Sequence, residues 1–274
     1  MPDRTAILGA GSWGMAIARH LALKGVPVTL WEFDPDEYRR LRSLRGNPDK
    51  LQGFTLPEEV AISHDLAEAV VDCRLVVLAV PSQSLRSVVI QLRDFLDSET
   101  GLVNLAKGIE TRTLKRMSEV IAGELEFPSP RIATISGPSH AEEVIRDMPT
   151  AVVAAGYDNE FVTKVQHLFS SSGFRVYQSD DLIGVELGGS LKNIIAIAAG
   201  IADGLGLGDN SKGAIITRGL AEITRLGVRM GASAETFAGL SGIGDLITTC
   251  TSRHSRNRYV GEKVGQGQAL EDVL

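Results

Sequence analysis

Three glycines near the start of the chain, Gly9, Gly11 and Gly14, have the G-x-G-x-x-G spacing of a dinucleotide-binding loop. They follow the apolar residues 5–8 and open a stretch of helical length, so the N–H groups of residues 12–15 would point at a bound pyrophosphate. The spacing alone is also compatible with an ordinary turn, because 29 of the 274 residues are glycine. Its position between an apolar strand and a helix favours a nucleotide site.

An acidic residue further along bears on which nucleotide would bind. Glu32 follows the apolar residues 28–31, about 20 residues after the glycines, where a carboxylate can accept hydrogen bonds from an adenosine ribose. The same carboxylate would repel the 2′-phosphate of NADP, so Glu32 favours NAD over NADP. Arg39 and Arg40 could neutralise such a phosphate, although arginines on a helix are also typical of a solvated face.

Lys192 is the best candidate for proton transfer. It follows two glycines and precedes the nearly uniformly apolar residues 194–202, so its ammonium would be partly desolvated. Desolvation lowers the pKa of a lysine toward the range useful for proton transfer. A lysine that snorkels at a helix start is the competing interpretation. Asp245, within SGIGDL, could orient Lys192 or bind a substrate hydroxyl, and a helix cap is the alternative for it.

A polar cluster near the C-terminus could hold a phosphate. Ser255, Arg256 and Asn257 are three successive hydrogen-bonding residues, and arginine can bind phosphate through two parallel hydrogen bonds. A solvated basic loop is the alternative. The cluster therefore indicates a small phosphorylated substrate.

Further polar or glycine-bearing residues end several predicted strands: Gly9, Glu32, Pro81-Ser82, Lys107-Gly108 and Gly137-Pro138-Ser139. In an open parallel sheet these ends line one crevice, where ligands bind. Lys107 would bring a cation to that crevice, although a surface lysine is an equal alternative. His140 is interpreted as a structural or rim histidine, because Lys192 is the better proton carrier.

The elements that must position these residues follow from hydrophobic patterning. Up to Asp180, short apolar runs alternate with amphipathic stretches, which predicts a parallel sheet covered by helices. Strands are predicted at 5–8, 28–31, 60–62, 75–80, 102–106, 132–135, 151–155 and 175–177, and the helices include 14–23 and 84–96. After Asp180 no β-rich run follows, and apolar residues fall on a helical face. We expect an α/β fold, with a Rossmann-like, doubly wound, mostly parallel sheet in residues 1–180 and an all-helical substrate and catalytic domain in residues 181–274.

The bulk composition excludes several classes of protein. With 43% hydrophobic residues and a net charge of −6, the chain is neither disordered nor a nucleic-acid binder by charge. Cys73 and Cys250 indicate no disulfide framework and no zinc site, and no other metal site is expected. The apolar residues 194–202 are too few to span a bilayer, and no signal peptide precedes the glycines, so no membrane insertion is expected and the cytoplasm is the predicted location.

Taken together and in order, GAGSWG, Lys107-Gly108, SGPS, LKN, SGIGDL and SRN resemble the bacterial NAD(P)-dependent glycerol-3-phosphate dehydrogenases. The resemblance runs from about residue 5 to 265. It implies an enzyme that reversibly reduces dihydroxyacetone phosphate to sn-glycerol 3-phosphate with NAD or NADP as coenzyme, that feeds phospholipid synthesis, and that forms a homodimer. A β-hydroxyacid dehydrogenase and a non-catalytic NAD-sensing module are the alternatives.

The resemblance also assigns roles to residues. The catalytic set comprises Lys192 as the proton-transferring lysine, Lys107 and Asp245. The coenzyme-binding set comprises Gly9, Gly11, Ser12, Trp13, Gly14, Glu32, Lys107, Ala141 and Arg256. The substrate-binding set comprises Lys107, Gly137, Ser139, Asp245, Ser255, Arg256 and Asn257. We expect the backbone N–H of Trp13 to help bind phosphate and its ring to face the helical domain, with packing of that ring as the alternative.

Two features depart from the family. Many bacterial relatives have a basic or neutral residue where this chain has Glu32. Relatives also continue for some tens of residues beyond GQGQALEDVL, so a shortened C-terminus is expected.

Overall fold

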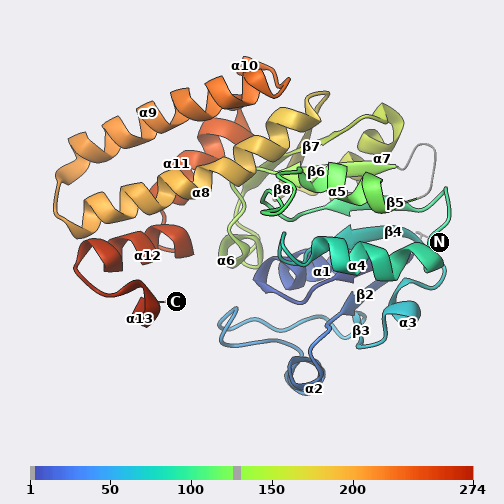
Figure 1. Ribbon diagram of the computed structural model, residues 1–274. Helices are drawn as coiled ribbons and strands as arrows, with labels where there is room; N and C mark the ends of the chain where they lie inside the picture. Colours follow the sequence, from blue (N-terminus) through green and yellow to red (C-terminus); the bar gives the residue numbers. More distant parts are fainter. Residues whose placement is uncertain (1–3, 126–130, 274) are drawn as a thin grey trace. The chain divides into compact units, whose positions relative to one another are not determined.

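The computed structural model of the protein describes residues 4–125 and 131–273 (Figure 1). The chain forms two compact units. The sheet unit comprises residues 1–135, 140–150 and 154–180. The helical unit comprises residues 136–139, 151–153 and 181–274.

One sheet of eight strands, in the order β3-β2-β1-β4-β5-β6-β7-β8, organises the first part of the chain. Its strands are β1 (Arg4–Leu8), β2 (Val28–Trp31), β3 (Ala61–Ser63), β4 (Cys73–Leu78), β5 (Gly101–Asn104), β6 (Ile132–Ser136), β7 (Thr150–Gly156) and β8 (Phe174–Ser179). The neighbouring strands from β3 through β6 pair in parallel. The strand order that reverses at β1 is typical of a doubly wound fold. Each of the eight predicted strands is confirmed, with ends shifted by at most a few residues.

β7 departs from the parallel arrangement. A Cβ on Gly156 would lie 2.7 Å from the carbonyl oxygen of Ile132, and one on Gly137 would lie 3.1 Å from Cα of Val152. The later residue of β7 therefore lies near the start of β6, and the earlier one near its end, so the two strands run antiparallel. The predicted mostly parallel, Rossmann-like sheet is confirmed with this exception.

The sheet is buried on both faces, as parallel sheets usually are. Successive residues of a strand point to opposite faces of the sheet. Ala6, Ile7 and Leu8 are consecutive and all fully buried, so β1 is covered on both faces. The covering helices are α1 (Ser12–Leu23), α2 (Pro35–Leu44), α3 (Leu66–Val70), α4 (Leu85–Leu92) with a 3₁₀ turn η1 (Arg93–Phe95), α5 (Met117–Glu124), α6 (Ala141–Val144) and α7 (Asn159–Phe169). Aspartates cap α2 and α7: Asp34 accepts from the N–H groups of the first turn of α2, and Asp158 accepts from the N–H of Phe161.

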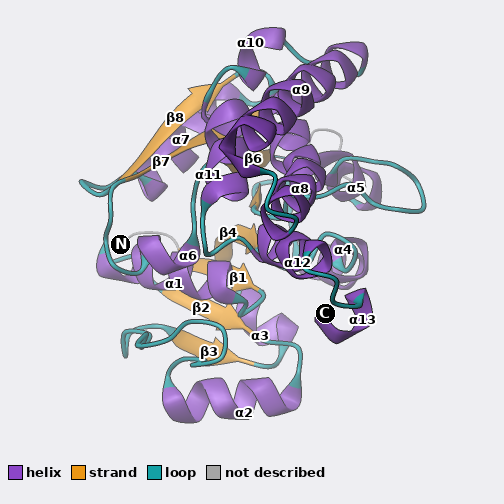
Figure 2. Ribbon diagram, turned by 90° about the vertical axis from the view of Figure 1, so that its left-hand side faces the viewer, coloured by secondary structure: helices purple, strands orange, loops and turns teal. Residues whose placement is uncertain are grey.

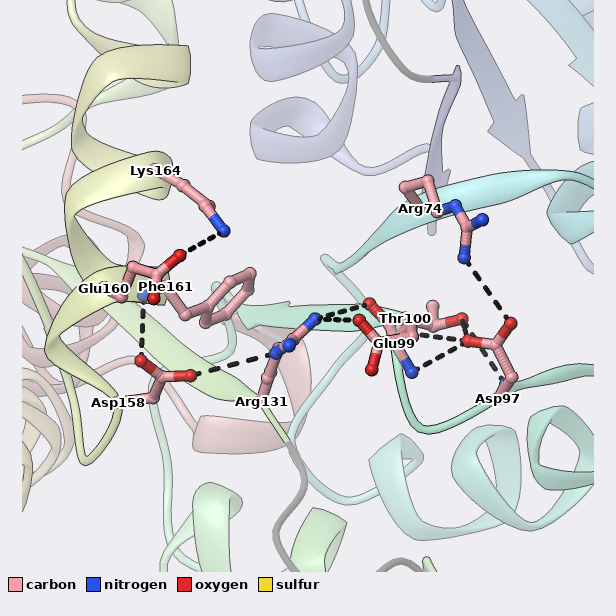
Figure 3. A network of polar contacts seen from close by, with 9 residues as sticks. All are labelled: Arg74, Asp97, Glu99, Thr100, Arg131, Asp158, Glu160, Phe161 and Lys164. Atoms are coloured by element: carbon pink, nitrogen blue, oxygen red, sulfur yellow. Dashed lines mark hydrogen bonds and ion pairs between the residues drawn. The ribbon is translucent and has the colours of Figure 1, made fainter.

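A network of charged residues lies at the amino ends of β5 and β6 (Figure 3). Arg131, just before β6, pairs with Glu99 at 2.8 Å and with Asp158 at 3.8 Å. Asp97 accepts hydrogen bonds from the N–H and the hydroxyl of Thr100 at 2.8 and 2.9 Å. Exposed pairs of this kind contribute roughly 0–1 kcal/mol each. The network lies at the amino ends of these two strands, whereas the predicted site residues Lys107 and Gly137 follow their carboxyl ends.

The described residues from 181 onward form helices and connecting loops. The helices are α8 (Leu182–Gly204), α9 (Gly208–Arg229), α10 (Ala234–Phe237), the π-helical turn η2 (Leu240–Gly244), α11 (Asp245–Thr251), α12 (Arg256–Gly265) and α13 (Leu270–Val273). Asp181 caps α8 through the N–H of Gly184 at 2.8 Å and also accepts from the Thr236 hydroxyl at 2.6 Å, which ties α10 to the start of α8. The predicted helical second part is confirmed.

Long apolar α8 is the core helix of the helical unit. With 23 residues, this helix is long and apolar enough to cross a membrane by length and composition, whereas the stretch 194–202 considered in the sequence is too short. However, 56% of its most apolar window is buried inside the protein, as expected of a core helix. α9 runs along it, and α12 packs against it (Figures 1 and 2).

Glycines bring α12 into close contact with α8. A Cβ on Gly200 would lie 2.1 Å from the carbonyl oxygen of Arg258, and one on Gly261 would lie 2.2 Å from that of Ile197. Gly204 and Gly265 repeat this pattern one turn further on. Only glycine allows the two backbones to approach this closely, so these four positions determine where α12 lies on α8.

Candidate active site

The three glycines of the loop between β1 and α1 are needed, or tolerated, for different structural reasons. Gly9 has a φ of +105°, and a Cβ there would lie 2.8 Å from the carbonyl oxygen of Ala79. A Cβ on Gly14 would lie 1.9 Å from the carbonyl oxygen of Gly9, so α1 can begin under the loop only with glycine. A Cβ on Gly11 would meet no atom of the described residues within 4 Å. Gly9 and Gly14 shape the loop, and Gly11 borders open space.

The start of α1 fits an anionic ligand. Gly11 is the N-cap of this helix, and no described side chain caps it. The N–H groups of a helix's first turn and the positive end of its dipole favour a negatively charged group. The open space at Gly11 and the uncapped first turn therefore fit the pyrophosphate of a dinucleotide such as NAD(P).

The side chains of Ser12 and Trp13 contact neighbours within the sheet unit. The Ser12 hydroxyl donates to the carbonyl oxygen of Lys50 at 3.0 Å. The Trp13 ring lies 6.4 Å from the ring of Phe174 in β8, centroid to centroid. This contact fits the interpretation that the Trp13 ring serves in packing, and the ring packs here against a strand of the sheet.

Glu32 lies directly after β2 and is 5% exposed. Its Oε1 accepts from the N–H of Asp34 at 3.1 Å, which fixes the carboxylate at the carboxyl end of the strand. Arg39 pairs with Asp36, and Arg40 lies 2.7 Å from a carboxylate oxygen of Asp49. Both arginines are therefore already paired with carboxylates.

A buried amide positions the loop that carries Lys107. The side chain of Asn104 donates to the carbonyl oxygen of Ala106 at 3.2 Å and accepts from its N–H at 3.0 Å. A Cβ on Gly108 would lie 2.3 Å from the Ser82 hydroxyl oxygen, so this loop lies against the loop that follows β4. Since β4 lies between β1 and β5, Lys107 and the glycine loop follow strands at the same edge of the sheet.

Hydrogen bonds and ion pairs from α4 and the residues before it fix the segment after Lys107. Nε and Nη2 of Arg86 each donate to the Glu110 carboxylate at 2.8 Å, and Arg86 also pairs with Glu124. Gln83 donates to the carbonyl oxygen of Ile109 at 2.8 Å. The bonds from Arg86 lower the pKa of Glu110 to about 2. Ala141, the last predicted coenzyme contact of the sheet unit, is a buried residue at the start of α6.

In the helical unit, Lys192 and Asp245 form a buried ion pair. Nζ of Lys192 donates to Oδ1 of Asp245 and, at 2.7 Å, to the hydroxyl oxygen of Thr249. The Thr249 hydroxyl donates to the backbone carbonyl of Asp245 at 2.6 Å. Lys192 is 6% exposed and Asp245 2%. The structure therefore places Asp245 where it can orient Lys192, one of the two roles that the sequence suggested for it.

The glycines before Lys192 explain how Asp245 reaches it. A Cβ on Gly188, one turn before Lys192, would lie 2.3 Å from the carbonyl oxygen of Ser241. The π-helical turn η2 can therefore lie directly on α8, and Asp245 follows it as the first residue of α11. π-Helical turns are frequent at functional sites.

The segment 136–139 belongs to the helical unit although it precedes α8 by more than forty residues. Gly137 has a φ of +138°, and the Ser139 hydroxyl donates to its carbonyl oxygen at 3.1 Å. Cδ of Pro138 would lie 3.9 Å from a Cβ on Gly244, the residue before Asp245. Gly137 and Ser139 therefore flank a residue that contacts the SGIGDL turn.

The cluster Ser255-Arg256-Asn257 begins α12. Ser255 is buried and is the N-cap, accepting from the N–H of Arg258 at 3.2 Å. Arg256 is exposed in the first turn. α12 runs along α8 in the same direction, since a Cβ on Gly200 would meet Arg258 and one on Gly204 would meet Glu262, so the first turn of α12 lies toward the Lys192 end of α8. The first turn of α12 is a second place where an anion could bind.

The predicted residues thus separate by unit. The sheet unit carries Gly9, Gly11, Ser12, Trp13, Gly14, Glu32, Lys107 and Ala141, and the helical unit carries Gly137, Ser139, Lys192, Asp245, Ser255, Arg256 and Asn257. The sequence analysis missed Thr249 and Asn104. Thr249 could have been found from its position four residues after Asp245, which places both on one helix face.

Comparison with known proteins agrees with this arrangement. A family profile described as the N-terminus of NAD-dependent glycerol-3-phosphate dehydrogenase matches residues 4–162, and one described as its C-terminus matches residues 181–274. A glycerol-3-phosphate dehydrogenase [NAD(P)+] of Chlorobium phaeobacteroides is 53% identical over 99% of this chain and 81% of its own length. One from Moorella thermoacetica is 53% identical over the whole of this chain and 81% of its own length.

Solved structures are similar as well. The crystal structure of glycerol-3-phosphate dehydrogenase from Coxiella burnetii has a TM-score of 0.96 at 40% identity, covering 99% of this chain and 83% of that one. The predicted family, enzyme class and coenzyme class are confirmed, and the matches do not favour a β-hydroxyacid dehydrogenase or an NAD-sensing module. The chain therefore belongs to the NAD(P)-dependent glycerol-3-phosphate dehydrogenases, the oxidoreductases that interconvert dihydroxyacetone phosphate and glycerol 3-phosphate.

Proposed function

We propose that Lys192 is the proton carrier of this reaction, with Asp245 and Lys107 as its partners in catalysis. The coenzyme, when bound, supplies a hydride to the ketone carbon of dihydroxyacetone phosphate. Negative charge then builds on the carbonyl oxygen, and an acid must give that oxygen a proton. Lys192 gives the proton during reduction and takes it back during oxidation.

The observation that carries this proposal is the buried contact of Lys192 with Asp245 and Thr249. An ammonium is retained in such a buried position only with partners that satisfy it. These partners orient Nζ and leave the charge on a side chain with little freedom to move. Lys107 adds positive potential, which stabilises a developing oxyanion.

The substrate is held, in this proposal, by the residues that the family resemblance assigns to it. Arg256 binds the phosphate together with Ser255 and Asn257 at the first turn of α12, where the helix dipole also favours an anion. Gly137, Ser139, Asp245 and Lys107 bind the remainder of the substrate. The Ser255 hydroxyl oxygen accepts from the N–H of Arg258, and its O–H can donate to the phosphate, whereas its N–H already donates to the carbonyl oxygen of Ser252 at 3.3 Å.

For the coenzyme, we propose Gly9, Gly11, Ser12, Trp13 and Gly14 as the pyrophosphate loop. Glu32, Lys107, Ala141 and Arg256 provide further contacts. NAD is the preferred form, because Glu32 lies fixed at the end of β2 while Arg39 and Arg40 are paired with carboxylates. A homodimer in the cytoplasm that supplies phospholipid synthesis is the expected biological form.

The test follows oxidation of NADH by its absorbance, first with dihydroxyacetone phosphate and then with a β-keto acid. We expect oxidation with dihydroxyacetone phosphate only, and faster oxidation of NADH than of NADPH. Oxidation with the β-keto acid alone would identify a hydroxyacid dehydrogenase. Analytical ultracentrifugation of the same preparation tests the dimer.

A further inference from the structure

We propose that Asp203 is a positioning residue that fixes the first turn of α12, and with it Arg256, relative to Lys192. The inference rests on the proposed role of Arg256 as the phosphate contact. Asp203 lies near the end of α8, the helix that carries Lys192. The two residues are roughly 16 Å apart along the axis at 1.5 Å per residue.

The Asp203 carboxylate joins three helices. Its Oδ2 accepts from Nε and Nη2 of Arg258 in α12, at 2.9 and 2.7 Å, and its Oδ1 accepts from Nζ of Lys212 in α9. The Asp203 side chain is 16% exposed, and those of Arg258 and Lys212 are each 19% exposed. A partly desolvated carboxylate with two cationic partners is held more firmly than an exposed pair.

Arg258 connects Asp203 to the first turn of α12, where the phosphate is proposed to bind. It lies two residues after Arg256, and its N–H donates to the Ser255 cap at 3.2 Å. Its carbonyl oxygen would lie 2.1 Å from a Cβ on Gly200, and its guanidinium binds Asp203, so α8 contacts both the backbone and the side chain of Arg258. The first turn of α12 therefore has little freedom to rotate on α8.

Glu262 offers a matched comparison. It also binds the Arg258 guanidinium, through Nη1 at 3.1 Å, but it lies four residues later on the same helix. The pair Arg258–Glu262 therefore cannot set the position of α12 on α8. Removing the Glu262 charge also takes a carboxylate away from Arg258, but it leaves the link between the helices in place.

The experiment compares dihydroxyacetone phosphate with dihydroxyacetone, which lacks the phosphate, at saturating NADH. In Asp203→Asn we expect kcat/KM for the phosphorylated substrate to fall about 10- to 100-fold, chiefly through KM, because a misplacement of about 1 Å can cost 10²-fold. We expect kcat/KM for dihydroxyacetone to stay within about twofold. Glu262→Gln is expected to resemble the wild type with both substrates.

Two further variants complete the test. Arg258→Lys keeps the charge but loses one of the two bonds to Asp203, and it serves if Asp203→Asn does not fold; we expect the same selective loss. Asp203→Asn in an Arg256→Ala background should cost nothing further, because interacting residues are not additive. Equal losses with both substrates, or an additive double variant, would overturn the positioning role. A wild type that is inactive with dihydroxyacetone phosphate would instead refute the proposed function, and the inference with it.

Discussion

A lysine and an aspartate that are both nearly excluded from water depend on each other for stability. Lys192 and Asp245 are 6% and 2% exposed, and each supplies the opposite charge that offsets the burial of the other. Removing one partner of such a pair typically costs about 3–5 kcal/mol. At the scale of single residues, Lys192 and Asp245 therefore contribute to stability as well as to the proposed catalysis. For variants of either residue, folding must be measured beside the reaction rate.

For Lys192→Ala we expect kcat to fall about 10²- to 10⁴-fold, because the proton carrier is lost. We also expect a lower melting temperature, because the buried Asp245 loses the opposite charge of Lys192. The check is steady-state kinetics beside thermal unfolding. The variant Lys192→Ala/Asp245→Asn should recover stability and no activity. Turnover near that of the wild type in a folded Lys192→Ala protein would refute the assignment.

Glu110 provides a prediction on pH. Its pKa falls from an ordinary 4.5 to about 2 in the folded protein, chiefly through its bonds to Arg86. A depressed carboxyl pKa contributes stability that is complete above the unfolded value and is lost as the pH falls toward the folded one. Between pH 4.5 and 2 the melting temperature should therefore fall more steeply in the wild type than in Glu110→Gln. Exposed Glu59→Gln is the control, and parallel curves for the wild type and Glu110→Gln would contradict the prediction.

At the scale of elements, glycines decide how the helices of the second unit pack. Gly188 lets the η2 turn lie on α8, and Gly200, Gly204, Gly261 and Gly265 let α12 do so. Glycine within a helix costs about 0.5–1 kcal/mol relative to alanine. The packing of the helices, which these close backbone contacts allow, offsets that cost.

Gly200→Ala tests this packing. Its Cβ would lie 2.1 Å from the Arg258 carbonyl oxygen, so α12 must move, and we expect a loss of about 1–3 kcal/mol. The control is Gly213→Ala in α9, where a Cβ would meet nothing within 4 Å among the described residues. That substitution should stabilise the protein by about 0.5–1 kcal/mol. Chemical denaturation measures both, and equal changes in the two variants would argue against the packing explanation.

At the scale of the whole molecule, the proposed coenzyme loop and the proposed phosphate site belong to different units. The glycine loop follows β1 of the sheet unit, and Arg256 begins α12 of the helical unit. Each unit has its own buried core, so a substitution at one site need not disturb the fold of the other. The two binding functions should therefore be separable by mutation.

Gly11→Ala and Arg256→Ala make that separation measurable. Gly11 has a φ of −69°, which alanine adopts, and its Cβ would meet no described atom, so the variant should fold normally. The added methyl group would lie where the proposed pyrophosphate binds, so we expect the KM for NADH to rise about 10-fold or more, as for a loss of about 1.4 kcal/mol. Arg256→Ala should chiefly raise the KM for dihydroxyacetone phosphate. An unchanged KM for NADH in Gly11→Ala would contradict the assignment of the loop.

Sequence by itself determined the features that depend on neighbours along the chain. The apolar runs predicted all eight strands, and those buried on both faces, such as β1 and β2, need consecutive apolar residues. The glycine spacing identified the loop after β1, and the neighbours of Lys192 indicated that it would be desolvated. Thr249 and Asn104 escaped notice because a single polar side chain has no periodicity.

Only the tertiary structure decided how distant residues meet. Lys192 and Asp245 are separated by 53 positions, and their contact depends on the approach of Ser241 to Gly188. The reversal of β7 and the membership of residues 136–139 in the helical unit were likewise not predictable. The physical reason is that local patterning fixes which face of an element is apolar, whereas the pairing of elements depends on close backbone contacts between segments far apart in the chain.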